Sequence, residues 1–279
     1  QRRSCAYQIH LLAKEKCWQN SNDRVERRRE AVQLRAQQEN FIDNSFDPII
    51  SYGIHAAINH YSATPETDIA IEPGNFLLAD TGGHYYEGTT DTTRTIVMGS
   101  VNDEQKKYFT AVLRGMLNLG NAKFRYGCTG VNLDYLARGP LWEMGQDFNH
   151  GTGHGVGYLL NVHEGPNSFR WRIIQGDNAV LEEGMITSDE PGYYVENQYG
   201  IRHENLLVCK KAEKTSFGQF MCFEHLTMVP FDLDAVVPEL MTVQERALLN
   251  NYHTQVYKKI SPYLEEEEKE WLKEATREI

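Results

Sequence analysis

The sequence predicts an α+β protein, because strand-like and helix-like segments occupy different stretches of the chain. Short β-rich segments broken by Gly, Pro and Asn lie between Phe46 and Gly99. A helical spacing of apolar residues follows from Asp103 to Leu119, and two further helices are expected at the C-terminal end. Of the 279 residues, 41% are hydrophobic and 24% are charged, which is the balance of a folded globular protein.

The N-terminal third is expected to hold one helix and then a sheet. Asp23 precedes a stretch without Gly or Pro, Arg24 to Asn40, which indicates a capped helix that is exposed or covered by a partner. Its apolar positions are sparse. The strand-like segments that follow are Pro48 to Tyr52, Ala56 to Tyr61, Asn75 to Asp80 and Thr92 to Met98.

In the middle of the chain, two expected helices precede a run of strands. The apolar positions that predict an inward-facing helix are Phe109, Val112, Leu113 and Met116. A second helix is expected over Asn132 to Met144, and the glycine-dense stretch from His150 to Gly157 is expected to be a loop or an irregular strand. Further strands are predicted at Met185 to Ser188, Arg202 to Lys210 and Phe220 to Val229.

The C-terminal segment has the pattern of two helices. Thr242 and Glu245 have the spacing of a capping box, and a helical stripe follows at Leu249, Tyr252, Val256 and Ile260. A last amphipathic helix is expected between Leu264 and Ile279. The acidic run from Glu265 to Glu268 lies within it and is interpreted as a solvated face.

Composition excludes several partners. Lys and Arg number 28 and Asp and Glu 39, so the formal charge is 28 − 39 = −11, which argues against nucleic acid as a partner. The apolar runs are far shorter than the roughly 18–20 residues that span a bilayer, and no membrane partner or signal sequence is expected.

The five cysteines are odd in number, without a C-x-x-C pair, and are interpreted as reduced thiols of a cytosolic protein: Cys5, Cys17, Cys128, Cys209 and Cys222.

Two acids stand at the ends of neighbouring β-rich segments. Asp80 ends an apolar run, Asp91 begins the next strand, and glycines lie between them. Two strands joined over that distance could bring both carboxylates to one side of a hairpin, where like charges repel unless a cation lies between them. The alternative is that both are ordinary turn residues, since Asp is common at strand ends.

Two histidines lie in the glycine-dense stretch, His150 and His154, and His163 follows closely. The glycines do not fit a dinucleotide fingerprint, because Val156 stands where that pattern needs Gly, and no P-loop Lys follows. We attribute them to a close approach of the backbone to a metal or a substrate. An isolated His, however, is more often structural than a ligand.

Two more acids complete a possible metal site. Glu190 precedes a Pro-Gly turn, and Glu204 lies inside an apolar strand, where a carboxylate needs a partner. Four carboxylates with one imidazole suit two hard or borderline divalent ions such as Mn²⁺ better than a structural zinc site. Two such ions would change the formal charge from −11 to about −7 and remove the repulsion within the cluster.

Six motifs carry a resemblance to a known family. They are Asp80-Thr-Gly-Gly, Gly88-Thr-Thr-Asp91-Thr-Thr-Arg-Thr, His150-Gly-Thr-Gly-His154-Gly-Val-Gly, Val162-His163-Glu-Gly-Pro, Asp189-Glu190-Pro-Gly-Tyr-Tyr and Gly200-Ile-Arg-His-Glu204-Asn. In this order they resemble the catalytic domain of aminopeptidase P, an Xaa-Pro aminopeptidase of the pita-bread metallopeptidase group. The resemblance therefore implies an α+β pita-bread fold with a helical C-terminal extension.

The resemblance also implies a set of site residues. The implied ligands of two divalent ions, Mn²⁺ with Zn²⁺ or Co²⁺ as alternatives, are Asp80, Asp91, His154, Glu190 and Glu204, with Asp91 and Glu204 bridging. The implied substrate-binding residues are His60, His150, His163 and Arg202. The implied catalytic roles are proton acceptance by Glu190 and donation to the developing oxyanion by His150 or His163. Two departures from the family, Ala79-Asp80-Thr81 and His203, remove no ligand.

The resemblance divides the chain into three parts: residues 1–27 match poorly, 28–215 form the catalytic domain, and 216–279 form the extension. The family carries two further N-terminal domains that wall the cleft and form the oligomer, and without a counterpart to them reduced activity is expected. The implied partners are proline-containing peptides and a second copy in a homodimer. The implied compartment is the cytoplasm.

Two other functions stay open at this stage. A prolidase-type Xaa-Pro dipeptidase uses the same ligands and differs in how the far end of the peptide is capped. A catalytically inactive pita-bread domain could instead bind peptides, although such a domain usually lacks ligands and this sequence has all five.

Overall fold

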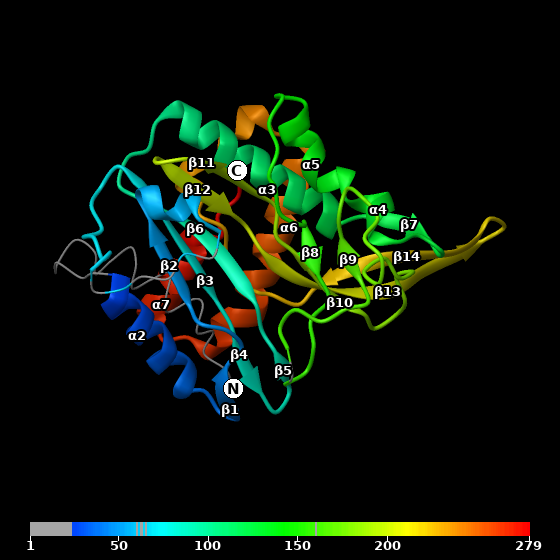
Figure 1. The fold of residues 1–279 in the computed structure, drawn as a ribbon, viewed down its shortest axis with the longest axis horizontal. Coiled ribbons are helices and arrows are strands. Elements are labelled where there is room, and N and C mark those ends of the chain that lie inside the picture. Colours follow the sequence, from blue (N-terminus) through cyan, green and yellow to red (C-terminus); the bar gives the residue numbers. More distant parts are fainter. Residues whose placement is uncertain (1–23, 60, 62–63, 65, 160) are drawn as a thin grey trace.

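The computed structural model describes residues 24–59, 61, 64, 66–159 and 161–279, with side chains in the first helix from Arg29 onward. Cys5, Cys17 and His60 lie outside the described residues. Strands and helices form layers in which the sheets are covered by helices α3, α6 and α7 (Figure 1). The expected α+β class is therefore confirmed.

The N-terminal sheet has the order β2-β3-β6. Its antiparallel strands are β2 (Ile49–Tyr52), β3 (Asn75–Thr81) and β6 (Thr92–Met98). All seven residues of β6 are buried, because both faces of the sheet are covered. Helix α2 (Arg24–Ala36) packs against β2 with Ala31 and Arg35 buried, while Arg29 and Gln33 are exposed.

The segment that connects β3 to β6 contributes two strands to a second, smaller sheet. This sheet has the order β1-β4-β5 and consists of β1 (Phe41–Asn44), β4 (Gly83–Tyr85) and β5 (Gly88–Thr89). The short helix η1 (Gly53–Ala57) occupies part of the segment expected to be a strand from Ala56 to Tyr61. That expectation was wrong, because the segment packs across β12 instead of adding a strand to the sheet.

Helix α3 (Asp103–Gly120) is the central helix, and its prediction is confirmed. A capping box of Asn102 and Gln105 begins it, and Phe109 packs on Phe76 of β3 with ring centroids 5.8 Å apart. The expected helix from Asn132 to Met144 is two helices, α4 (Gly130–Leu133) and α5 (Tyr135–Trp142). Asp134 stands between them with its buried carboxylate bound by other side chains.

The C-terminal half of the sheet system is a long, interrupted ribbon. The strands are β10 (Ile186–Asp189), β11 (Gly192–Val195), β12 (Tyr199–Arg202), β13 (Asn205–Thr215) and β14 (Gly218–His225). β10 pairs with β13 and β11 with β12, and β7 (Lys123–Arg125) completes the order β10-β13-β14-β7. The β13–β14 hairpin projects from the body of the molecule (Figure 1).

The C-terminal segment packs on α3. Its elements are η2 (Leu233–Ala235), η3 (Pro238–Leu240), α6 (Val243–Ile260), η4 (Ser261–Tyr263) and α7 (Glu266–Ala275). The predicted capping box of Thr242 and Glu245 is present, and Glu245 also accepts a 3.0 Å hydrogen bond from Arg114 of α3. Leu249 and Val256 of α6 are fully buried against Leu113 and Met116.

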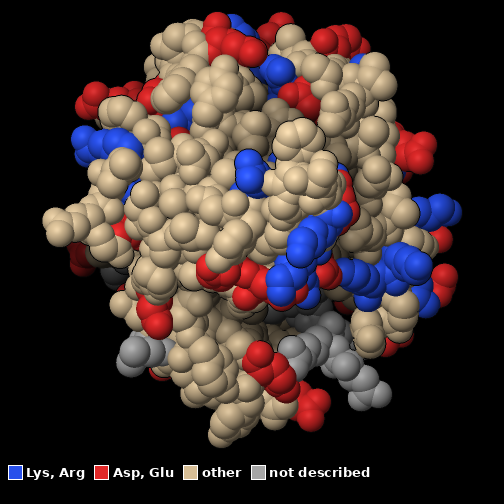
Figure 2. Space-filling model, turned by 90° about the vertical axis from the view of Figure 1, so that its right-hand side faces the viewer, with Lys and Arg blue, Asp and Glu red and all other residues tan. Residues whose placement is uncertain are grey.

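Figure 2 shows charged side chains of both signs scattered over a face that is otherwise formed by other residues. Lys211 lies 2.8 Å from Glu183, and Lys123 pairs with Glu213. Over the part of the chain that the structure describes, no helix combines the length and the apolar composition needed to cross a bilayer.

Two glycines on neighbouring helices give opposite predictions for stability. A Cβ at Gly115 would lie 2.1 Å from the carbonyl oxygen of Ala137, where α3 meets α5, whereas a Cβ at Gly139 would meet nothing closer than 3.5 Å. We expect Gly115→Ala to lower the free energy of unfolding by about 1–3 kcal/mol through overpacking. Gly139→Ala should raise it by up to about 1 kcal/mol, because Ala is the better helix former. Urea unfolding measures both, and equal effects would contradict this packing.

Candidate metal centre

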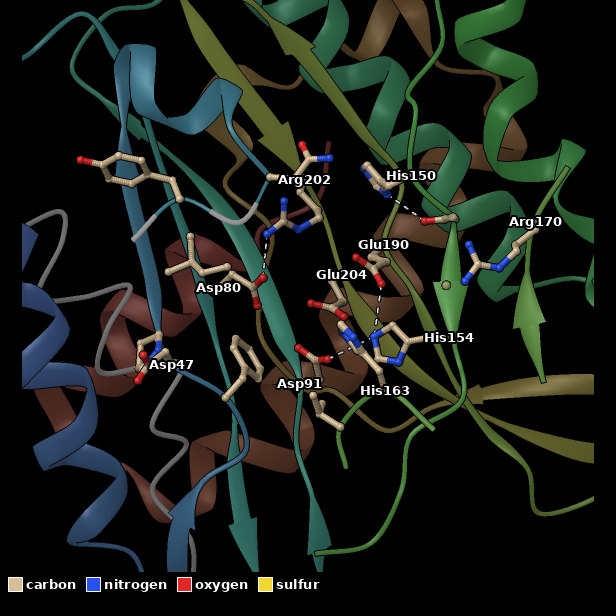
Figure 3. A pocket seen from close by; sticks show the side chains of 18 residues that line it. Asp47, Asp80, Asp91, His150, His154, His163, Arg170, Glu190, Arg202 and Glu204 are labelled. Carbon is tan, nitrogen blue, oxygen red and sulfur yellow. Dashed lines mark hydrogen bonds and ion pairs between the residues drawn. The ribbon is translucent and has the colours of Figure 1, made fainter. Parts of the chain in front are cut away.

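The β3–β6 hairpin, the ribbon from β10 to β13 and the glycine-rich segment around His154 meet at a cavity of about 470 Å³. Figure 3 shows carboxylates and imidazoles converging at its floor, with Asp47 and Arg170 farther out on opposite sides. The cavity is lined by the five predicted metal ligands, Asp80, Asp91, His154, Glu190 and Glu204. The structure thus brings together residues spread over more than a hundred positions of sequence.

The first pair of acids comes from the N-terminal sheet. Asp80 lies in β3, and Asp91 immediately precedes β6. The antiparallel register pairs Asp80 with Thr93, so the two carboxylates lie at the same end of the hairpin. Both side chains are buried, at 8% and 4% exposure, which agrees with the hairpin interpretation rather than with two solvent-exposed turn residues.

The second pair of acids lies in the interruption of the ribbon. β10 and β13 pair up to Asp189 and Asn205, and pairing resumes between Gly192 and Arg202. Pro191 lacks an N–H group and cannot donate a ladder hydrogen bond. Glu190 and Glu204 occupy the two sides of this gap, so the single expected strand from Arg202 to Lys210 is divided where the second acid is placed.

His154 comes from the two-residue strand β8 (Gly153–His154), which pairs with β9 (Ser168–Phe169). A Cβ at Gly153 would lie 1.8 Å from the carbonyl oxygen of Ser188, and one at Gly155 would lie 2.1 Å from that of Glu164. These glycines therefore permit close approach between protein backbones. The expected approach of this backbone to a metal or a substrate stays a prediction, and Gly151 and Gly153 line the cavity.

The ligand atoms are close enough to share ions. Three sets of three side chains each have donor atoms within 4.8 Å of one another: Asp91, His154 and His163; His154, Glu190 and Glu204; and Asp80, Asp91 and Glu204. Asp91, His154 and Glu204 each belong to two sets. The set containing His163 was not expected, because that residue was assigned to substrate.

The hydrogen bonds around His154 fit a cation. Its Nδ1 lies 2.9 Å from the carbonyl oxygen of Gly155, which can only accept, so Nδ1 carries the proton. Nε2 then directs its lone pair at Asp91 Oδ2, 3.4 Å away, and at Glu190 Oε1, 3.3 Å away. Three acceptors facing one another require a proton or a cation between them. Asp80 Oδ1 is also buried without a hydrogen-bond partner.

Burial and mutual repulsion favour uptake of positive charge here. Burial raises the pKa of Glu190 to about 7, and burial with the neighbouring acids raises the pKa of Glu204 well above its ordinary range. Burial disfavours protonated His154, but the hydrogen bond with Asp91 and the charge of Glu190 outweigh it and raise its pKa to about 9. Divalent ions would neutralise the same charges.

Arg202 links the cluster to His150 through Tyr194. Arg202 Nη2 donates to Asp80 Oδ2 at 2.6 Å, and Nη1 donates to the Tyr194 hydroxyl at 2.9 Å. His150 Nδ1 lies 2.8 Å from the Gly151 carbonyl oxygen, so in the neutral ring Nε2 accepts from Tyr194 at 3.0 Å. Tyr194 was not identified from the sequence, although it lies in the Glu-Pro-Gly-Tyr-Tyr motif.

A buried arginine holds the loop that carries His150. Arg138 of α5 is fully buried and donates to the carboxylates of Asp134 and Asp147 and to the carbonyl oxygen of His150, at 2.7, 2.6 and 2.8 Å. Asp134 also accepts from the Thr152 hydroxyl at 2.5 Å, so its carboxylate links α5 to the segment that follows His150. No sequence motif signalled this network.

The α+β fold carries a cluster of carboxylates and histidines of the kind that binds metal ions in hydrolases. This cluster defines the class of protein. Comparison with known families then gives the family itself. The model of metallopeptidase family M24 matches residues 6–211, and that of the C-terminal region of peptidase M24 matches residues 219–279. The chain belongs to the M24 metallopeptidases.

Relatives in this family are similar in sequence to most of this chain. Aminopeptidase P1 of Arabidopsis thaliana is 43% identical over 249 residues, which is 88% of this chain and 38% of that protein. A probable Xaa-Pro aminopeptidase P of Arthroderma otae is 43% identical over 92% of this chain and 42% of its own length. The chain thus spans about two fifths of the length of these relatives.

Solved structures show the same fold. The X-prolyl aminopeptidase of Caenorhabditis elegans, described as a cytosolic enzyme with a dinuclear active site, matches 99% of this chain and 46% of its own with a TM-score of 0.92 and 36% identity. The prolidase of Pyrococcus furiosus matches 73% of this chain and 57% of its own with a TM-score of 0.62 and 31% identity. The expected pita-bread fold is confirmed.

The raised pKa values predict how stability depends on pH. Glu190 and His154 bind protons more tightly in the folded chain than in the unfolded one, where values near 4.5 and 6.5 apply. Their contribution is present at low pH and is lost as pH rises through about 7 and then about 9. We expect the unfolding free energy of the EDTA-treated chain to fall between pH 6 and pH 9, and excess Mn²⁺ to reduce that fall by replacing the protons. Denaturant unfolding tests this, and a metal-free chain that gains stability over the range would contradict it.

Proposed function

We propose that this chain is the catalytic part of an Xaa-Pro aminopeptidase that removes the N-terminal residue before a proline. The observation that carries the proposal is the cluster of five potential ligands in a fold that matches a dinuclear X-prolyl aminopeptidase over 99% of this chain. Residues 28–215 would form the catalytic domain and 216–279 an extension packed on it. The contacts of α6 with α3 support that division.

Two divalent ions would be held by Asp80, Asp91, His154, Glu190 and Glu204, with Asp91 and Glu204 shared between them. The overlapping sets of donor atoms support this assignment. Oxygen-rich donors with one imidazole favour Mn²⁺ over Zn²⁺ or Co²⁺. When bound, such ions lower the pKa of a shared water and polarise the scissile carbonyl.

The remaining residues would orient the peptide and move protons. Glu190 is the proposed proton acceptor, because its carboxylate lies in one donor set with His154 and Glu204, beside the place where the ions and their water would bind. His163 is the proposed donor to the developing oxyanion, because both ring nitrogens of neutral His150 are used by Gly151 and Tyr194. His150 and Arg202 line the cavity and are kept as substrate-binding proposals, and each is hydrogen-bonded to the Tyr194 hydroxyl. His60, which lies outside the described residues, is kept as a substrate-binding proposal.

The proposed partners are proline-containing peptides and a second copy of the chain. A proline nitrogen in a peptide bond has no N–H group, so the pyrrolidine ring must be recognised by shape. Tyr61 and Val162 line the cavity and offer apolar surface for such a ring. A cytosolic location is proposed from the C. elegans relative.

A prolidase-type dipeptidase is the second candidate. The Pyrococcus furiosus prolidase shares the fold but matches 73% of this chain, against 99% for the aminopeptidase. The greater coverage favours the aminopeptidase. An inactive peptide-binding domain is disfavoured, because all five potential ligands converge on one cavity.

Peptide hydrolysis separates these functions. We expect the Mn²⁺-loaded chain to release arginine from an Arg-Pro-Pro peptide, and not from the Arg-Ala-Pro control, because only the first has the Xaa-Pro bond at its N-terminus. Mass spectrometry of the products measures this. Cleavage of Arg-Pro alone would establish the dipeptidase. If no peptide is cleaved, two bound ions would favour a catalytic part with reduced activity, and failure to bind ions would favour the binding domain.

The shared position of Asp91 predicts a loss of metal on its substitution. Asp91→Asn should lose at least one ion and abolish turnover, because an amide supplies no negative charge to either of the two sets in which Asp91 takes part. The matched control is Asp47→Asn, since Asp47 lines the same cavity but belongs to none of the three sets. Metal analysis after gel filtration should give fewer ions for the first variant only. Full metal content with retained activity in Asp91→Asn would refute the assignment.

A further inference from the structure

A second buried arginine lies beneath the acid cluster. Arg94, in β6, is only 4% exposed, and its guanidinium carbon lies 4.0 Å from the ring centroid of Phe231. Its hydrogen bonds go to carbonyl oxygens, an amide oxygen and a hydroxyl. This guanidinium therefore donates hydrogen bonds to several backbone segments and holds them in contact.

Two of these bonds fix the main chain on either side of the Glu204 carboxylate. Arg94 Nη1 donates to the carbonyl oxygens of Glu204 and Thr93, at 2.5 and 2.8 Å. The backbone N–H of Glu204 donates to the same Thr93 carbonyl oxygen at 3.1 Å, and the Thr93 hydroxyl donates to Glu204 Oε2 at 2.8 Å. Glu204 belongs to neither β12 nor β13, so these bonds replace the ladder that would otherwise hold it.

The other side of the guanidinium contacts the C-terminal region. Nη2 donates to the Val229 carbonyl oxygen at 2.8 Å and to the Tyr252 hydroxyl at 3.2 Å, and Nε donates to the Pro230 carbonyl oxygen at 3.1 Å. Tyr252 lies in α6, is 3% exposed, and donates its own proton to Val229 at 2.8 Å. A continuous set of hydrogen bonds thus runs from α6 to Glu204.

We propose that Tyr252 and Arg94 are positioning residues for Glu204, through which the C-terminal region sets the metal affinity of the site. The inference rests on the proposed metal centre. Glu204 takes part in two of the three donor sets, so a small displacement of its backbone alters the geometry at both. Outer hydrogen-bond partners of metal ligands commonly change metal affinity by about 10–100-fold when they are removed.

The test is Tyr252→Phe, which removes one hydroxyl and keeps the ring packed against Phe231. We expect its weaker Mn²⁺ site to lose about 10-fold in affinity, measured as free Mn²⁺ by electron paramagnetic resonance during titration of the full chain. Arg94→Lys should lose more, because an ammonium cannot reproduce the planar fork of donors. Circular dichroism and unfolding curves establish that each variant is folded.

Two variants on the same helix serve as controls. Tyr257→Phe removes a hydroxyl that makes no hydrogen bond among the described residues. Val256→Ala leaves a gap at a fully buried position one turn beyond Tyr252 and loosens α6 without touching Arg94. Both should bind Mn²⁺ as the unmodified chain does.

The outcomes are distinct. Weaker binding in Tyr252→Phe and Arg94→Lys, with both controls unchanged, supports the inference. Unchanged affinity in Tyr252→Phe overturns it while leaving the metal centre intact, and equal losses in Tyr252→Phe and Val256→Ala assign the effect to general stability and also overturn it. Failure of the unmodified chain to bind two ions would overturn the proposed centre and this inference with it.

Discussion

The rest of the site depends on one electrostatic constraint: four carboxylates and an imidazole, all mostly buried, converge on one cavity. Asp91 and Glu204 are almost completely buried, and desolvation raises the pKa of each. Like charges at such distances are stable only with compensating positive charge. Arg202 supplies one such charge through its hydrogen bond to Asp80, and the proposed divalent cations would neutralise the remaining negative charge.

The fold meets this constraint with breaks in regular structure. Pro191 interrupts the long ribbon but the register is kept, since Asp189 pairs with Asn205 and Gly192 with Arg202. Glu190 and Glu204 therefore lie opposite each other in the gap, on the same face of the ribbon. Gly153 allows the short strand β8 to approach the backbone of Ser188 closely enough to place His154 beside both hairpins. Backbone groups that lose their ladder partners at these breaks form hydrogen bonds with side chains instead. One example is the Glu204 carbonyl oxygen, which accepts from the Arg94 guanidinium.

Two buried arginines have comparable structural roles on different sides of the cavity. Arg138 ties the loop that carries His150 to α5, and Arg94 ties Glu204 to the C-terminal region. A guanidinium suits this task because its five donors have a fixed geometry and satisfy several carbonyl oxygens at once. The C-terminal region is consequently joined to β6 and Glu204 by buried hydrogen bonds as well as to α3 by apolar packing.

The sequence alone determined the α+β class, the helix from Asp103, the capping box at Thr242, and the four acids and one histidine that converge. Periodicity, capping and ordered motifs are local signals, which a single sequence carries. Only the tertiary structure decided the break at Asp134, the helical turn at Gly53–Ala57, the role of Tyr194 and the link from Tyr252 to Glu204. These features depend on contacts between residues far apart in the chain, for which a single sequence carries no signal.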